Sequence, residues 1–151
     1  MTTLIAKDIS VRTATPEDLP SLEAMYDTFS PMETALGLPP ADPARRKSWL
    51  NTLSAGINLI AVSEDKPAGH LALMPGEHSA EMALFVHQDF RRRGIGTALT
   101  NEAVRLCRDR GLRMLWVLIN GDNNAARSGL LKYGFHTAWE SQGEIRMEFP
   151  L

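Results

Sequence analysis

The chain of 151 residues is poor in cysteine, and its one thiol, Cys107, excludes several classes of protein. A lone thiol cannot form an intramolecular disulfide, build a cysteine-based zinc site or supply a four-thiolate iron–sulfur cluster. The histidines fall in different predicted elements without the close spacing of metal ligands, at positions 70, 78, 87 and 136. We therefore expect no metal site, and we expect the reducing cytoplasm as the compartment.

Long hydrophobic runs are also absent. No stretch approaches the roughly 18 uncharged apolar residues that a membrane-spanning helix needs. The first ten residues lack the basic segment followed by an apolar one that marks an export signal. We expect a soluble protein that is not exported and that does not bind membranes.

The sequence carries no large excess of charge of either sign. Sixteen Lys and Arg oppose eighteen Asp and Glu, so the net charge of −2 gives no general basic field for nucleic acid. The average hides a basic segment, because residues 91–113 hold seven arginines against Glu102 and Asp109. We expect this segment to bind an anion and the acidic remainder to be solvated surface, with a cationic partner as the alternative for the latter.

The composition, 44% hydrophobic and 23% charged, is that of one globular domain with a sizeable core. No internal repeat, low-complexity tract or linker divides the chain. We expect residues 1–151 to form a single domain. Within it, residues 30–43 contain few strong structure-formers, which predicts a mobile lid.

The region up to residue 87 predicts two helices and four strands. Residues 8–14 alternate as a strand does, and Thr15 followed by Pro16 marks the start of a helix that ends near residue 28. A second helix is expected over 42–56. Three strand-like runs with short turn-rich connections then predict an antiparallel meander, over 57–63, 68–74 and 79–87.

The remainder of the chain predicts a crossover and a final strand pair. Apolar residues between 95 and 107 follow helical spacing, and Gly111 ends that helix. Residues 112–119 are nearly all apolar, which is typical of a strand covered on both faces. Strand, helix and strand of these lengths indicate a right-handed crossover between parallel strands. A helix over 122–133 and strands over 135–141 and 144–149 complete an α/β fold.

The most informative stretch runs from Val86 to Thr97, between a strand and a helix, and carries two glycines inside a cluster of arginines. Free N–H groups and the helix dipole attract anions to a helix N-terminus, and glycine lets phosphate oxygens approach the main chain. A dinucleotide fingerprint would need glycine where Leu99 stands, and a nucleoside-triphosphate loop would need Gly-Lys-Ser/Thr. The residues therefore predict a phosphate site of another type.

Arg91, Gly94 and Gly96 resemble motif A of the GNAT superfamily of N-acetyltransferases, whose pattern is Arg/Gln-x-x-Gly-x-Gly/Ala after a strand that ends Val-x-x-x-aromatic. The order of elements resembles the family over nearly the whole chain. The pattern Asn-x-x-Ala…Gly-Phe is also present, in Asn123, Ala126, Gly134 and Phe135. The resemblance implies a mixed, mostly antiparallel sheet of six to seven strands, flanked by about four helices and splayed between the strands near 79–87 and 112–119.

The resemblance also implies acetyl-CoA as the cosubstrate. Its pyrophosphate would lie over the loop formed by Arg91, Arg92, Arg93, Gly94, Ile95, Gly96 and Thr97, and Asn123 would contact it too. In the family, the strand that ends here at Val86 carries a bulge and splays from its parallel neighbour. Main-chain groups freed in this way bond the pantetheine and the thioester carbonyl, and here they would belong to Leu84, Phe85 and Val86. An N–H group aimed at the developing oxyanion would lower the barrier.

An amine must lose a proton before it attacks a thioester, so the reaction needs a base. Glu81 is the first candidate, because this carboxylate stands in mid-strand on the face that alternation gives to Ala83, Phe85 and His87. Glutamates of this strand serve as the base in several GNAT members, and Glu-x-Ala before Val-x-x-Asp resembles bacterial and archaeal protein-lysine acetyltransferases. The alternative interpretation is an ordinary polar residue on an open sheet face.

Many family members protonate the departing thiolate with a tyrosine of the last helix, and Leu130 occupies that position here. Tyr133, one turn later, is the remaining candidate for the acid, with core packing as the alternative. Water could also protonate the thiolate. The leucine at the usual tyrosine position also leaves open a hypothesis of another class, in which the protein is a non-catalytic module that binds acyl-CoA and regulates a partner.

In the family, the acceptor lies between the first two helices, their connecting loop and the final strands. The candidates for lining it are Tyr26, Phe29, Met32, Glu33, Trp49 and Trp139. We expect a small amine as the acceptor, and a protein lysine is the alternative. His87 is expected to be a polar strand-end residue, with a proton shuttle as the alternative, and Cys107 to be inert packing. Dimers are common in the family, so a homodimer stays open.

Overall fold

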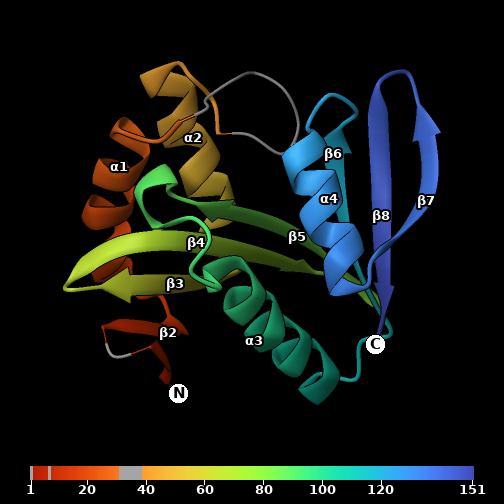
Figure 1. Cartoon of the computed structure of the whole chain (residues 1–151), viewed down its shortest axis with the longest axis horizontal. Coiled ribbons are helices and arrows are strands. Elements are labelled where there is room, and N and C mark those ends of the chain that lie inside the picture. The colour runs from red at the N-terminus through yellow and green to blue at the C-terminus, as the bar shows by residue number, and fades with distance from the viewer. Residues whose placement is uncertain (1, 7, 31–38) are drawn as a thin grey trace.

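A mixed β-sheet forms the centre of the protein in the computed structural model, which describes residues 2–6, 8–30 and 39–151 (Figure 1). The strand order is β1-β2-β3-β4-β5-β6-β8-β7. The strands are β1 (Thr3–Ala6), β2 (Ile9–Thr13), β3 (Ile57–Ser63), β4 (Lys66–Pro75), β5 (Ser79–Val86), β6 (Met114–Asn120), β7 (His136–Ser141) and β8 (Glu144–Pro150). Neighbouring strands pair antiparallel except β5 and β6, which are parallel.

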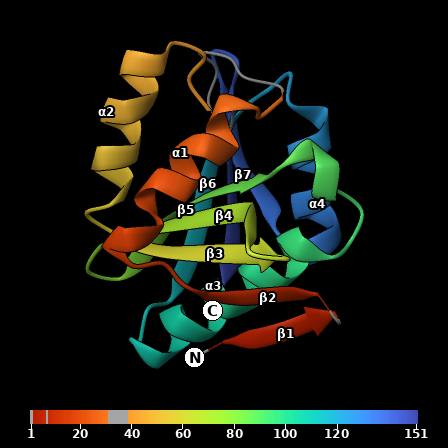
Figure 2. The same ribbon diagram turned by 90° about the vertical axis from the view of Figure 1, so that its left-hand side faces the viewer.

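Helices cover both faces of this sheet. They are α1 (Leu19–Asp27), α2 (Pro43–Leu53), α3 (Ile95–Asp109) and α4 (Asn124–Tyr133), with 3₁₀ turns η1 (Pro16–Asp18) and η2 (Gln88–Phe90). Helices α1 and α2 lie on one face and α3 and α4 on the other (Figure 1, Figure 2). A hydrophobic core forms on each side of the sheet as a result. None of the helices among the described residues combines the length and apolar composition that crossing a bilayer requires.

Side-chain caps set the start of two of these helices. The Asp42 carboxylate accepts a hydrogen bond from Arg45 N at 2.9 Å, at the first turn of α2. The Asn123 Oδ1 atom accepts one from Ala126 N at 3.2 Å, at the first turn of α4. Such caps satisfy N–H groups that a helix cannot pair internally. The first turns of α2 and α4 are therefore partly satisfied by the chain itself.

Helix α3 packs closely on β4 because Gly69 has no side chain. A Cβ at that position would lie 2.9 Å from Ile95 Cγ2 and 3.1 Å from Leu99 Cδ1. Together with Ala103 and Cys107, these two residues form the buried stripe of the helix. The contact holds the first turn of α3 against the sheet, beside the end of β5.

Strands β5 and β6 pair only over their first three residues, and Glu81 opposite Trp116 is the last of these pairs. Beyond this point the two strands separate. The strands β6, β8 and β7 are turned steeply away from β3, β4 and β5 (Figure 1). The separation leaves the later part of β5 without a strand partner on that side.

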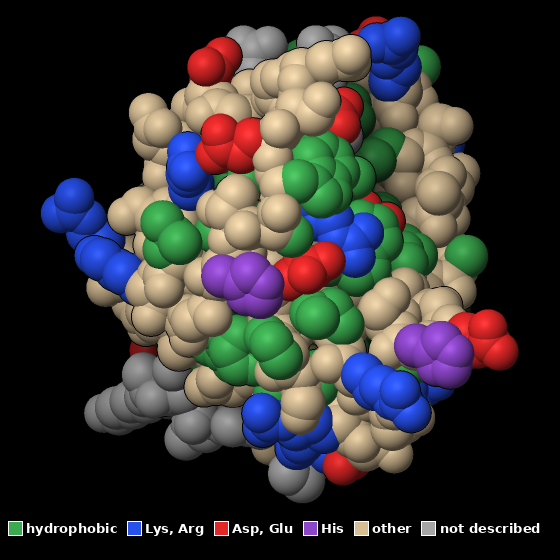
Figure 3. Space-filling view, turned by 90° about the vertical axis from the view of Figure 1, so that its right-hand side faces the viewer, with side chains coloured by type: hydrophobic (Ala, Val, Ile, Leu, Met, Phe, Trp, Pro, Cys, Tyr) green, Lys and Arg blue, Asp and Glu red, His purple; other side chains and the backbone are tan. Residues whose placement is uncertain are grey.

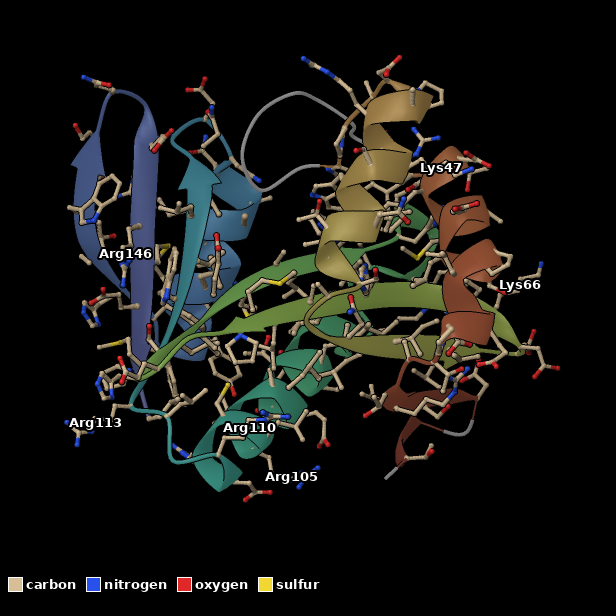
Figure 4. The ribbon with its side chains drawn as sticks, turned by 180° about the vertical axis from the view of Figure 1, so that it is seen from behind. Lys47, Lys66, Arg105, Arg110, Arg113 and Arg146 are labelled. Atoms are coloured by element: carbon tan, nitrogen blue, oxygen red, sulfur yellow. The ribbon has the colours of Figure 1, made fainter. Side chains whose placement is uncertain are left out.

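The predicted α/β fold is confirmed, including the seven expected strands, the parallel crossover and the splay, and β1 adds an eighth strand. Two expectations were wrong. Strand β6 is not covered on both faces: Leu115, Val117 and Ile119 are buried in alternation with half-buried residues, because α1 and α2 lie over β3 to β5 instead (Figure 4). Strand β5 has no bulge, since its register against β4 is continuous from Ala80 to Val86.

Candidate active site

A cavity of about 960 Å³ opens beside β5, where β6 turns away. Its two ends are lined by different residues, and we name them the loop end and the carboxylate end. The loop end consists of Arg91, Arg92, Gly94, Ile95, Gly96 and Thr97. The carboxylate end consists of Arg45, Trp49, Thr52, Leu53, Met74 and Glu81, while Phe29 lines the cavity beside the loop, with its ring centroid 5.7 Å from the Arg91 guanidinium. Strand β5 forms the wall that connects the two ends.

Helix α3 begins at the loop end without a side-chain cap, unlike α2 and α4. Its N-cap is Gly94, in a left-handed conformation with φ of +78°. Ala98 donates to Gly94 O at 3.0 Å, which starts the helical ladder. The N–H groups of Ile95, Gly96 and Thr97 precede that bond and have no acceptor within the helix. An anion at this end would meet these donors and the positive end of the helix dipole.

The three arginines of the loop are placed differently. The Arg91 guanidinium is held by the main chain, donating from Nε to Val86 O at 3.1 Å and from Nη2 to Ser30 O at 2.7 Å. Arg93 stacks on the aromatic ring of η2, 5.5 Å from its centroid, and does not line the cavity. Arg92 lines the cavity from a backbone with φ of +63°. Of the three predicted phosphate contacts, Arg92 is the one best placed to offer its side chain to an anion.

The basic segment identified in the sequence is divided in space. Arg105, Arg110 and Arg113 lie around the far end of α3 and the start of β6 (Figure 4). Arg105 forms ion pairs with Glu102 and Asp109 on its own helix. The expectation that the whole segment binds one anion was therefore wrong, because its later arginines lie at the negative end of the helix dipole.

Alternate residues of β5 turn their main-chain groups toward the space left by β6. His87 N donates to Ala68 O of β4 at 2.9 Å, which sets the phase of the antiparallel ladder. In that phase, Leu84 and Val86 direct their N–H and C=O groups to the cavity side, and Phe85 directs its own to β4. Phe85 lines the cavity with its ring instead.

Glu81 lies at the carboxylate end, half-buried on the face of β5 that α1 and α2 cover. No residue within 2–6, 8–30 and 39–151 forms a hydrogen bond or ion pair with its carboxylate. Burial raises the pKa of the Glu81 carboxyl, and the positive charge of Arg146 opposes that shift. An unpaired carboxylate with a raised pKa is well suited to accept a proton.

Arg146 approaches Glu81 from β8, across the face of β6 that no helix covers (Figure 4). Its guanidinium stacks on Trp116, 4.1 Å from the ring centroid, and its Nε donates to Glu148 at 2.8 Å. Strand register places Glu81, Trp116 and Glu148 in one row on the same face. The stack and the ion pair hold a positive charge near Glu81, a relation between distant strands that the sequence did not reveal.

The residues predicted around the leaving group lie near the junction of α3 and α4. The Tyr133 hydroxyl donates to Asn101 Oδ1 at 2.7 Å, and burial raises the Tyr133 pKa, which keeps the phenol protonated. Leu130 is buried and lines the cavity together with Tyr133 and Asn123. The Asn123 side-chain oxygen caps α4, and that bond does not use its amide nitrogen.

Helix α2 lines the carboxylate end with one stripe of side chains. The stripe has the spacing i, i+4, i+7 and i+8 of a single helix face, in Arg45, Trp49, Thr52 and Leu53. Trp49 was a candidate from the sequence, whereas Arg45 was not. The helical spacing was visible in the sequence, but nothing in it indicated which face of α2 meets the cavity.

A buried chain of hydrogen bonds supports this wall. The Tyr26 hydroxyl lies 2.7 Å from His70 Nδ1, and His70 Nε2 lies 2.7 Å from Asn58 Oδ1. Asn58 donates through Nδ2 to main-chain oxygens at the end of α2, so His70 donates to Asn58 and accepts from Tyr26. Burial lowers the His70 pKa to about 4, which keeps the ring neutral. The Tyr26 ring in turn contacts Trp49 and Phe85 edge-on.

The aromatic candidates for the acceptor site do not stay together. Phe29 and Trp49 line the cavity, and Tyr26 is fully buried behind them. Trp139 is 43% exposed on β7, where hydrophobic, acidic and basic side chains share the outer surface (Figure 3), and it does not line the cavity.

The other candidates take these positions. His87 is buried, with Nδ1 accepting from Asp89 N at 3.2 Å and Nε2 lying 3.0 Å from Thr28 Oγ1, so both ring nitrogens have partners. Cys107 is buried in the stripe of α3, as expected of inert packing, and burial raises its pKa. Two further candidates lie outside the described residues: Met32 and Glu33.

Comparisons with known sequences identify relatives of this chain. The model of the acetyltransferase (GNAT) family matches residues 22–135. An uncharacterized N-acetyltransferase of Methanocaldococcus jannaschii is 38% identical over 64 residues, which are 42% of this chain and 28% of that protein. YwnH of Bacillus subtilis, provisionally named a phosphinothricin acetyltransferase, is 26% identical over 137 residues, 84% of this chain and 83% of that protein.

The fold is also found among solved structures. YncA of Salmonella typhimurium, provisionally assigned as an acetyltransferase and solved with its cofactor acetyl-CoA, matches with a TM-score of 0.73 at 16% identity. The match covers 96% of this chain and 95% of that one. Because the family model spans more than half of the sequence, the chain belongs to the acetyltransferase (GNAT) family, a family of acetyl-CoA-dependent N-acetyltransferases.

Proposed function

We propose that this acetyltransferase moves the acetyl group of acetyl-CoA to a small primary amine, by direct attack while both substrates are bound. One observation carries the proposal. A continuous cavity has three free N–H groups of α3 at one end and the unpaired carboxylate of Glu81 at the other. The first feature suits a phosphate group and the second suits an amine that must lose a proton.

The loop end fits acetyl-CoA. The uncapped N–H groups of Ile95, Gly96 and Thr97 would hold its pyrophosphate, and Arg92 would add a charge-assisted contact. Gly96 leaves a space about the size of one methyl group beside β5, since a Cβ there would reach ordinary contact with Val86 Cγ2 at 3.7 Å. The main-chain groups of Leu84 and Val86 would bond the pantetheine, and Asn123 would contact it from α4. When bound, acetyl-CoA supplies an activated acetyl thioester.

The residues of the chain would divide the chemistry between them. Glu81 takes a proton from the acceptor ammonium, directly or through a water molecule, and so frees the nitrogen lone pair. An N–H group of Leu84 or Val86 stabilises the oxygen of the thioester carbonyl as negative charge develops on it. Tyr133 stands as the proton donor for the thiolate, once its hydroxyl leaves Asn101.

Two observations support a small acceptor. The carboxylate end is a recess walled by α2 and β5, with Trp49 and Leu53 among its lining. The relative YwnH, which shares most of its length with this chain, carries the name of an enzyme for phosphinothricin.

The test is acetyl-CoA consumption, followed as free thiol release, with polyamines, amino acids, aminoglycosides and lysine-containing peptides as acceptors. We expect turnover with one class of small amine and none with the peptides. Turnover confined to the peptides would replace the small amine with a protein lysine. Acetyl-CoA binding without turnover on any acceptor would contradict the proposed reaction and favour a non-catalytic acyl-CoA-binding module.

A further inference from the structure

The charged groups that line the cavity are few. Arg91 and Arg92 belong to the loop end, and Arg45 and Glu81 belong to the carboxylate end. The proposed function assigns the loop to the phosphates of the cosubstrate and Glu81 to the proton of the amine. Arg45 has no part in either task, although it lines the same recess as Glu81.

Three consecutive cations of α2 have three different environments. Arg46 is buried, and its guanidinium bonds Asp27 at 2.6 Å and main-chain oxygens before the helix. Lys47 lies on the side of α2 away from β6 and does not line the cavity (Figure 4). Arg45 shares the cavity stripe with Trp49. Within the described part of the chain, no side-chain hydrogen bond or ion pair engages the Arg45 guanidinium.

We propose that the acceptor amine also carries an anionic group, and that Arg45 is the specificity residue that binds this group. The inference rests on the proposed function, because it places the amine of the acceptor beside Glu81. The apolar body of such a molecule lies along Trp49 and Leu53, and its anionic end forms a charge-assisted hydrogen bond with the guanidinium. A diamine or polyamine would instead bring a second positive charge toward Arg45, which is unfavourable.

The length of α2 sets the separation between the two charges of the acceptor. Arg45 and Leu53 are eight residues apart on one face, which corresponds to about 12 Å along the helix axis. The flexible side chain of Arg45 can extend along the helix, which shortens the distance that the acceptor must span between its amine and its anionic group. The amine and the anion should therefore be separated by several bonds, as in an ω-amino acid or in lysine that reacts at its side-chain amine.

The experiment compares acceptors that differ only in the anionic group. The pairs are 4-aminobutanoate with propylamine, 6-aminohexanoate with pentylamine, and lysine with cadaverine, each assayed by thiol release at saturating acetyl-CoA. We expect the wild-type enzyme to prefer the carboxylate member of the favoured pair by about tenfold or more in kcat/KM, as for a charge-assisted contact at an exposed site. Equal rates within every pair would overturn the inference.

Variants of α2 connect this preference to one side chain. R45Q should remove the preference by raising KM for the carboxylate member alone, and R45E should reverse it in favour of cadaverine. K47Q is the matched control, since it removes the same charge from the opposite side of the helix. A loss in R45Q that is equal for both members of a pair, or a loss of preference in K47Q, would contradict the role of Arg45.

Direct binding separates this inference from the proposed function. Calorimetric titration of 6-aminohexanoate into the enzyme with bound CoA should give a dissociation constant about tenfold weaker in R45Q than in the wild type. If amines are acetylated without regard to their anionic group, the proposed function stands and the inference fails. If acetyl-CoA binds and no amine is acetylated, the proposed function fails and the inference fails with it.

Discussion

The two ends of the cavity present different parts of the chain to the ligands proposed for them. The loop end uses the main chain of consecutive residues, with a left-handed Gly94 and the uncapped first turn of α3. The carboxylate end presents side chains from elements far apart in the sequence, with Arg45 on α2 and Glu81 on β5, and the charge of Arg146 on β8 acts on Glu81 from outside the cavity. A main-chain site suits a group that every reaction shares, whereas a side-chain site can change with the acceptor.

This comparison makes the two ends separable by mutation. A change at the loop end should abolish acetyl-CoA binding whichever acceptor is used. A change at the carboxylate end should leave acetyl-CoA binding intact and alter turnover, pH dependence or acceptor preference. A variant that breaks this division would show that the ends are coupled.

The largest effect is expected at Gly94, for which Gly111 at the other end of α3 is a matched control. Both have left-handed φ, +78° and +73°, and at both a Cβ would meet no described atom within 4 Å. G94L and G111L should each lose about 1–2 kcal/mol of unfolding free energy from backbone strain, as measured by urea denaturation. Only G94L should weaken acetyl-CoA binding, by roughly 100-fold or more (about 2.7 kcal/mol), because its side chain occupies the phosphate position.

Calorimetric titration of acetyl-CoA into G94L and G111L measures whether only the first of these variants loses affinity. Equal affinities in G94L and the wild type would remove the loop end from cosubstrate binding. A similar loss in G111L would mean that strain in α3, rather than the phosphate position, controls the affinity.

The next largest effect is expected at Glu81, the proposed proton acceptor at the carboxylate end. E81Q should lower kcat by roughly 10²–10⁴-fold near neutral pH, the range of a lost general base, and leave the dissociation constant of acetyl-CoA unchanged. The base works when ionised, so the wild-type rate should rise with pH through a pKa above the ordinary carboxyl value, since burial raises the pKa of Glu81. E81Q should lose this rising limb.

A second carboxylate tests whether charge alone explains the effect. Glu144 is exposed at the start of β8 and does not line the cavity, so E144Q removes one negative charge without touching the site. Its pH–rate profile should match the wild type. If E81Q keeps the wild-type profile as well, Glu81 is not the base.

The geometry of the loop end could be predicted from sequence because it depends on local conformation. Gly94 and Gly96 follow a strand and begin a helix, and that order is enough to expect free N–H groups near a phosphate. The strands and the crossover were equally accessible, since their signals are periodicity and turn composition. Glu81 was found for a similar reason, because a carboxylate in an apolar strand is conspicuous within eight residues of sequence.

The partners of Glu81 could not be predicted in the same way. Arg146 reaches it only because β8 inserts next to β6 in the strand order, ahead of β7. Arg45 lines the recess only because one particular face of α2 packs toward β5. Both facts depend on tertiary arrangement, and neither leaves a local pattern in the sequence. The expectation that residues 91–113 act as one basic unit failed likewise, because α3 carries the two arginine groups to its opposite ends.

The smallest effect is expected at Arg146, which acts on the carboxylate end through Glu81. Its positive charge favours the ionised carboxylate, so R146Q should raise the pKa of Glu81 further and move the rising limb of the pH–rate profile to higher pH. Turnover near neutral pH should fall a few-fold, and it should recover at higher pH because the base itself is intact. R146K keeps the charge but loses the planar stack on Trp116, so the rising limb of its pH–rate profile should lie between those of the wild type and R146Q.

R127Q is the control for this prediction. Arg127 of α4 forms an ion pair with Glu140 of β7, on the face of the β7–β8 pair opposite to Arg146, so the pH–rate profile of R127Q should not move. A shift in R127Q equal to that in R146Q would indicate a general field of the protein, and an unmoved limb in R146Q would leave burial as the one control on the Glu81 base.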